Sequence, residues 1–105
     1  MARDRRNLSP IFKDILGKGN ENVYFQSPAP HMLKYPCIIY ELNNRDTHHA
    51  DDLIYKDMNR FTVTLIDRNP DNTEYVDKLL NLQYCSYDRR FIADNLYHDV
   101  FNLYY

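Results

Sequence analysis

Apolar residues recur along the chain at two different intervals, and the interval predicts where helices and strands lie. Near the N-terminus, the segment IFKDIL at residues 11–16 carries its apolar side chains at helical spacing. Ser9-Pro10 provides a helix start, because a Ser side chain can cap free N–H groups and Pro suits the first turn. Gly17 provides the stop. We therefore expect a short amphipathic helix over residues 10–16.

Three segments in the middle of the chain have the composition or the alternation of β-strands. A short strand is expected over residues 22–26, followed by an extended Ser-Pro-Ala-Pro linker. Residues 37–42, CIIYEL, are apolar at both parities, which predicts a strand that is covered on both faces and lies at the centre of the sheet. Residues 60–68, RFTVTLIDR, alternate with a period of two, which predicts a strand with one buried face.

The last third of the chain is expected to contain a second short helix and a hairpin. Apolar residues recur at helical spacing over residues 75–82, after an Asn-Pro-Asp-Asn turn. Residues 83–92 and 96–105 resemble two strands around Ala93-Asp94-Asn95, where Asp and Asn tolerate turn conformations. A C-terminal helix stays an alternative, because apolar residues there also recur at intervals of three and four, although the aromatic residues favour a strand.

These elements predict one α+β domain over residues 1–105, with a mixed or antiparallel sheet of about four to five strands and two short helices packed on it. Residues 1–19 would form the N-terminal helix and its lead-in, and residues 20–105 the α+β core. The expected order is helix, three strands, helix, two strands. A chain of 105 residues has room for one core with little surplus stability, which favours additional stabilisation by oligomerisation.

A long polar segment, residues 43–59, separates two of the expected strands. Loops of this length inside a compact domain are usually functional or disordered, and an ordinary hairpin tip is the alternative to a contact loop. This segment has too little apolar content to anchor itself. Its apolar patch is therefore a candidate for contact with a partner. The two terminal tyrosines are also candidates, because tyrosine rings supply contact area and tolerate water. The predicted interface residues are Leu53, Ile54, Tyr55, Tyr104 and Tyr105.

The charge balance excludes a general attraction to nucleic acids or membranes. Thirteen Lys and Arg residues against fifteen Asp and Glu residues give a net charge of −2, so there is no net positive field. The longest apolar run, residues 37–40, is far shorter than the ~20 residues of a membrane-spanning helix. Short arginine clusters at residues 3–6 and 88–90 alternate with aspartate, which predicts solvated or intersubunit ion pairs. Two cysteines form no disulfide framework, which fits a reducing cytoplasm.

Candidate chemistry is limited to two small groups of side chains. A metal site of imidazoles and carboxylates would use His48, His49, Asp51 and Asp52 in the polar segment, with His98 from elsewhere. Their spacing fits no established ligand pattern, and a solvated loop and a hydrogen-bonded structural histidine are the favoured interpretations. Cys85 could be a nucleophile if a base lowered its pKa, but its alternating surroundings favour a structural thiol. We therefore expect no enzyme activity, no catalytic residue, no metal and no cofactor.

The segments VYFQSPAP, KYPCIIYEL, RFTVTLIDRNPDN and YDRRFIADNLYHDVFNLYY, in this order over residues 23–105, resemble the tail terminator proteins of long-tailed bacteriophages, also called tail completion or minor structural proteins. The resemblance implies a small α+β virion protein, assembled in the host cytoplasm, that forms a hexameric ring at the head-proximal end of the tail tube. Its partners would be further copies of itself, the tail tube protein and the head-completion or connector protein. Genome DNA would pass through the ring without specific recognition.

The ring also predicts a contact between a sheet edge of one subunit and its neighbour, a geometry that closes. Two other functions stay as alternatives. A head-completion or neck adaptor, or a general interaction module, could share this fold and composition. A small metal- or cysteine-dependent enzyme would use the loop histidines or Cys85.

Overall fold

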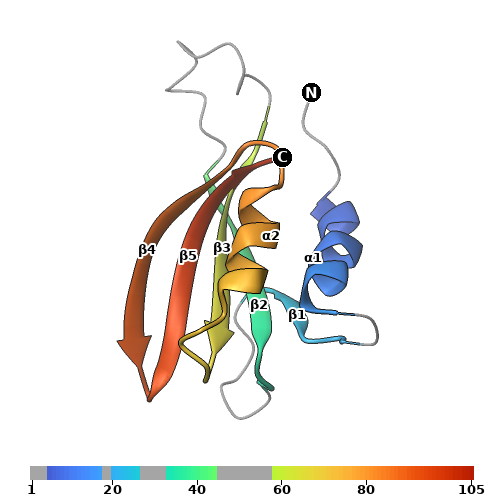
Figure 1. Cartoon of the computed structure of the whole chain (residues 1–105). Helices are drawn as coiled ribbons and strands as arrows, with labels where there is room; N and C mark the ends of the chain where they lie inside the picture. Colours follow the sequence, from blue (N-terminus) through green and yellow to red (C-terminus); the bar gives the residue numbers. More distant parts are fainter. Residues whose placement is uncertain (1–4, 18–19, 27–32, 45–57) are drawn as a thin grey trace.

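The computed structural model of the chain describes residues 5–17, 20–26, 33–44 and 58–105, and these form an α+β fold, as the sequence predicts. Two α-helices lie on one face of a five-stranded mixed sheet (Figure 1). No helix in these ranges is long and apolar enough to span a membrane. The elements are, in chain order, the 3-10 turn η1 (Arg5–Asn7), α1 (Leu8–Leu16), β1 (Val23–Phe25), β2 (Cys37–Asn44), β3 (Arg60–Asp67), α2 (Thr73–Leu80), β4 (Cys85–Ala93) and β5 (Leu96–Tyr104).

The strand order in the sheet is β1-β2-β3-β5-β4, with β1 parallel to β2 and every other pair antiparallel. The expectation that residues 37–42 form the centre is wrong, because β3 is the middle strand. The expected burial on both faces is confirmed for Cys37, Ile38, Ile39 and Tyr40, whereas Glu41 and Leu42 are exposed. Apolar residues at both parities indicate that both faces of β2 are covered, but they do not indicate its position in the sheet. A strand next to the edge strand can also be covered on both faces.

The main hydrophobic core lies between the two helices and the sheet. Tyr40 is near its centre, with its ring centroid 5.2 Å from those of Phe12 and Phe25. A third ring, that of Phe61, lies 6.1 Å from Tyr40. Each of the buried side chains of this core exposes 6% of its surface or less; they are Leu8, Phe12, Ile15, Leu16, Ile38, Tyr40, Phe61, Val63, Leu65, Leu79, Phe101 and Leu103.

A smaller core covers part of the opposite face of the sheet. Cys37, Ile39 and Ile66 are its buried members. Half-buried side chains from β1, from β5 and from the segment before β2 pack against them; these are Tyr24, Leu33, Tyr35 and Leu96. The segment just before β2 therefore packs on the back of the sheet, which explains the apolar residues at both parities in β2.

Helix α1 begins earlier than the sequence predicts. The helix follows η1 directly, and its first residue is Leu8. Leu8 is 1% exposed. The expected cap at Ser9 is wrong: Ser9 lies inside the helix, and its Oγ is 2.7 Å from the hydroxyl oxygen of Tyr40. A buried tyrosine hydroxyl needs a hydrogen-bond partner, and Ser9 is that partner. At the other end, Gly17 has φ 118°, a conformation that favours glycine.

The C-terminal hairpin is confirmed, and the helical alternative is wrong. Asp94 and Asn95, the two residues between β4 and β5, have φ of 53° and 61°. A two-residue loop with both φ positive matches the right-handed twist of a hairpin. The helix expected over residues 75–82 is present as α2, which begins and ends two residues earlier.

The polar segment begins later than expected, because Asn43 and Asn44 belong to β2, where Asn44 pairs with Arg60. Residues 45–57 lie outside the described residues. They include the predicted contact residues Leu53, Ile54 and Tyr55, and the imidazoles and carboxylates of the metal hypothesis, His48, His49, Asp51 and Asp52.

Candidate functional site

Strand β4 is the most exposed element of the described sheet. It pairs with β5 on one side and forms the edge of the sheet on the other. Residues 86–92 are all exposed, whereas β5 beside it contains buried residues along its centre. Figure 1 shows β4 at the side of the sheet farthest from α1. An edge strand presents unpaired backbone N–H and C=O groups, which makes β4 the candidate site for binding another chain.

A β-bulge in β4 decides which side chains face the helices. Tyr87 pairs with Phe101 and Arg89 pairs with Val100, so Asp88 is an extra residue opposite no partner of its own. In an uninterrupted strand, Tyr87 and Arg90 would point to opposite faces, because they are three residues apart. The extra residue reverses the alternation. Tyr87 and Arg90 therefore point to the same face and reach the same carboxylate.

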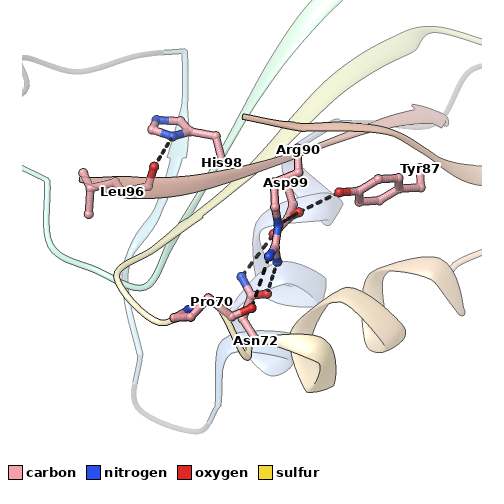
Figure 2. Close-up of polar contacts among 7 residues, drawn as sticks. All are labelled: Pro70, Asn72, Tyr87, Arg90, Leu96, His98 and Asp99. Carbon is pink, nitrogen blue, oxygen red and sulfur yellow. Dashed lines mark hydrogen bonds and ion pairs between the residues drawn. The ribbon is translucent and has the colours of Figure 1, made fainter. Parts of the chain in front are cut away.

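That carboxylate is Asp99, whose side chain is 1% exposed. Arg90 lies directly opposite it on β4 and donates from Nε to Oδ1 at 2.8 Å and from a terminal nitrogen to Oδ2 at 3.1 Å. The Tyr87 hydroxyl donates to Oδ1 at 2.7 Å, and Asn72 Nδ2 donates to Oδ2 at 3.1 Å. Figure 2 shows these side chains converging below β5. We call Asn72, Tyr87, Arg90 and Asp99 the polar cluster.

The polar cluster also ties the edge strand to the start of α2. The Arg90 guanidinium donates to Asn72 Oδ1 at 2.8 Å and to the carbonyl oxygen of Pro70 at 3.2 Å. Asn72 is the N-cap residue of α2, yet its side chain makes no capping hydrogen bond. Asn72 as a whole residue is 3% exposed. Both polar atoms of its side chain form hydrogen bonds within the cluster. One arginine thereby joins β4, β5 and the turn before α2.

The electrostatics of the cluster keep Asp99 ionised. Burial by itself would raise the pKa of Asp99, but the hydrogen bonds from Arg90, Tyr87 and Asn72 outweigh it, so the pKa lies below its ordinary value. The same contacts, with the hydrogen bond to Asp99 as the main cause, raise the pKa of Arg90. Burial and the bond to Asp99 raise the pKa of Tyr87. At neutral pH the cluster is an ion pair with a neutral phenol and amide as further donors.

The exposed part of β4 carries large apolar side chains. Tyr87 is 43% exposed, Phe91 40% and Ile92 65%. Phe91 stacks on His98 of β5 with a centroid distance of 4.5 Å, and Arg89, which pairs with Asp88 at 2.6 Å, lies 5.8 Å from the Phe91 ring. An edge strand with exposed apolar groups of this size is suited to a protein contact.

The predicted interface tyrosines lie at the end of β5, at the opposite end of the hairpin from its turn. Tyr104 and Tyr105 are both half-buried. Tyr105 packs against the main core, and its backbone exchanges hydrogen bonds with Asn59 at 2.9 and 3.1 Å. The backbone N–H of Tyr104 donates to the Tyr84 carbonyl at 3.1 Å. Part of each ring is therefore used within the subunit, and the role of the remainder in an interface stays a prediction.

Of the side chains in the enzyme hypothesis, only His98 and Cys85 lie among the described residues. His98 Nδ1 lies 3.1 Å from the carbonyl oxygen of Leu96, on the other side of β5 from Asp99 (Figure 2). Burial raises the pKa of Cys85 to about 11, so this thiol is protonated at neutral pH. Burial, with a contribution from Asp67, raises the pKa of Cys37 to about 12. Within the described ranges, no three His, Cys, Asp or Glu residues are arranged to hold a metal ion.

Sequence reasoning missed the polar cluster, although one signal for it was available. Asp99 has the same parity along β5 as Phe101 and Leu103, so alternation alone predicts a charged group on the core face. Such a group requires a partner. The arginine pattern suggested solvated or intersubunit ion pairs for Arg89 and Arg90, and this is wrong for Arg90, whose partner is buried in its own subunit.

No protein-family model, curated protein or solved structure matches the chain.

Proposed function

We propose that this chain is a virion structural protein: a tail terminator that forms a ring at the head-proximal end of a phage tail tube, stops tube growth and joins the tail to the head connector. The four segments that resemble tail terminators include β1, β3 and β5 completely, and most of β2 and β4. The small α+β fold is the kind that the resemblance implies. Further copies of the chain, the tail tube protein and the connector are its partners in this proposal.

The observation that carries the proposal is the β4 edge. A protein that works by assembly needs an ordered surface that stays exposed in the free subunit. Residues 86–92 are exposed along their whole length, while the polar cluster holds the strand in place through the contacts of Asp99. A ring requires two different contact surfaces on each subunit, and a sheet with two edges supplies them.

The experiment is tube polymerisation in the presence of the purified chain. The tail tube protein of the same phage is allowed to polymerise with the chain or with an unrelated protein at equal concentration, and tube lengths are measured by electron microscopy. We expect shorter tubes, with a ring at one tube end, when the chain is present, and neither effect with the unrelated protein. Unchanged tube lengths, or a single copy of the chain per neck in assembled particles, would contradict the proposal.

The same material separates a terminator from a neck adaptor. An adaptor binds the head-completion or connector protein and leaves tube growth unchanged, whereas a terminator binds the tube end as well. Pelleting of the chain with preformed tubes is therefore the deciding measurement.

A further inference from the structure

We infer that the β4 edge of one copy pairs in antiparallel fashion with the β1–β2 edge of the next copy, so that the sheets of neighbouring subunits continue into one another. This inference rests on the proposed ring and names the contact that builds it. It commits to a second copy of this chain as the occupant of the β4 edge.

The first surface is the outer side of β4. Among the described residues, no strand pairs with this side. Three large apolar side chains are exposed on β4, Tyr87, Phe91 and Ile92. The bonds of Arg90 to Asp99 and Asn72 hold the strand from one face only. The outer backbone groups are therefore fixed in position and free to accept an extended partner strand.

The second surface is the opposite edge of the same sheet. Strand β1 is three residues long and pairs with Ile38, Ile39 and Tyr40 only. From Glu41 onward, β2 has no partner on that side in the described part of the chain. Leu42 is 48% exposed there, and Glu41 is exposed as well. This edge thus also combines unpaired backbone with an exposed large apolar side chain.

Strand direction and charge match the two edges to each other. Because β1 and β2 run parallel to β5, and β4 runs antiparallel to β5, a neighbouring copy whose strands keep the same direction meets β4 with an antiparallel strand. Arg89 on β4 has a side chain that is 62% exposed and pairs with Asp88, and Glu41 on the other edge can share this guanidinium as a second carboxylate. Of the five large apolar residues that are exposed in the described part of the chain, Leu42 lies on one edge, three lie on the other, and Leu80 lies on α2.

A two-fold contact between two β4 strands is the competing arrangement. It would use the same exposed strand twice and leave both β1–β2 edges unpaired, so assembly would stop at a dimer. A contact between two different edges instead continues from copy to copy and closes when the rotation allows it. The two arrangements therefore make opposite predictions for a variant that blocks only the β1–β2 edge.

The test uses three matched variants, each with a new lysine in place of an exposed apolar residue. Lysine on an edge strand opposes strand pairing. Ile92→Lys blocks the β4 edge, Leu42→Lys blocks the β1–β2 edge, and Leu80→Lys on α2 is the control. Thermal unfolding verifies that each variant folds, and native mass spectrometry counts subunits in the free chain and in the chain released from tail tubes.

We expect rings from the wild type and from Leu80→Lys, and monomers from each edge variant alone. A mixture of the two edge variants should form 1:1 pairs, because one copy retains its β4 edge and the other its β1–β2 edge. Dimers of Leu42→Lys beside monomers of Ile92→Lys would overturn the inference in favour of the two-fold contact. Edge variants that form rings and cap tubes like the wild type would overturn it while leaving the proposed function standing. A wild type that caps no tubes would contradict the proposed function itself.

Discussion

Strands β3 and β4 lie on either side of β5 and pair with it in the same antiparallel manner, yet they are held in place by different forces. In β3, Phe61, Val63 and Leu65 expose 1% of their surface or less and belong to the main core. In β4, residues 86–92 are all exposed. Apolar burial fixes the central strand, and directional hydrogen bonds to one buried carboxylate fix the edge strand.

The difference explains how a small subunit can keep an exposed strand ordered. The polar cluster needs only one face, because Arg90 and Tyr87 reach Asp99 from the side that the helices occupy. The outer edge and the other face stay available for a partner.

The largest expected effect is at the central strand. Phe61→Ala should lower the free energy of unfolding by about 3 to 5 kcal/mol, because it empties a buried site beside Tyr40. Urea unfolding of the free chain measures this, with Thr62→Ala on the opposite face of β3 as the control. A loss below about 1 kcal/mol would mean that the centre of the sheet does not depend on apolar burial.

The second effect tests the hydrogen bonds of the edge. Asp99→Asn keeps the size of the side chain but removes the charge that faces Arg90. We expect a loss of about 3 kcal/mol, at the low end for a broken buried ion pair, because the Arg90 side chain is 35% exposed. Asp88→Asn is the control, since the pair of Asp88 with Arg89 is exposed and should contribute less than about 1 kcal/mol. Equal losses in the two variants would contradict a special role of the cluster.

A third prediction follows from the lowered pKa of Asp99. In the unfolded chain this carboxyl titrates near its ordinary value, about 3.9. Since its pKa is lower in the folded chain, its stabilising contribution is complete above about pH 4 and decreases as the pH falls through the folded pKa. Urea unfolding between neutral and strongly acidic pH should therefore give a difference between wild type and Asp99→Asn that shrinks below about pH 4. A difference that stays constant with pH would exclude Asp99 as the titrating group.

The smallest expected effect concerns an exposed side chain of the edge strand. Ile92 is 65% exposed, so Ile92→Ala should change the free energy of unfolding of the free chain by no more than about 0.5 kcal/mol. Thermal unfolding at low protein concentration measures this without a contribution from assembly. A loss similar to that of Phe61→Ala would remove the distinction between the two strands.

Much of the fold could be predicted from the sequence because the deciding signals are local. The alternation over residues 60–68 identified a strand. Its one buried face is present from Arg60 to Leu65, whereas Ile66 and Asp67 are both buried, so the end of β3 is covered on both faces. Helical spacing located both helices, and Asp94-Asn95 marked the turn of the hairpin. The candidate site was less accessible. Its predicted residues came from apolar content and position in the chain, whereas the cluster around Asp99 depends on four residues that are distant in sequence.

The sequence by itself determined which segments form helices and strands, because periodicity reports what each short segment buries. Only the tertiary structure decided which strand lies in the middle, since periodicity does not record which neighbour covers a face. It also decided that the extra residue at Asp88 turns Arg90 toward Asp99. A bulge reverses the alternation of a strand, but no local sequence pattern marks its position. The contacts of Arg90 that depend on the bulge form only when β4, β5 and the start of α2 come together.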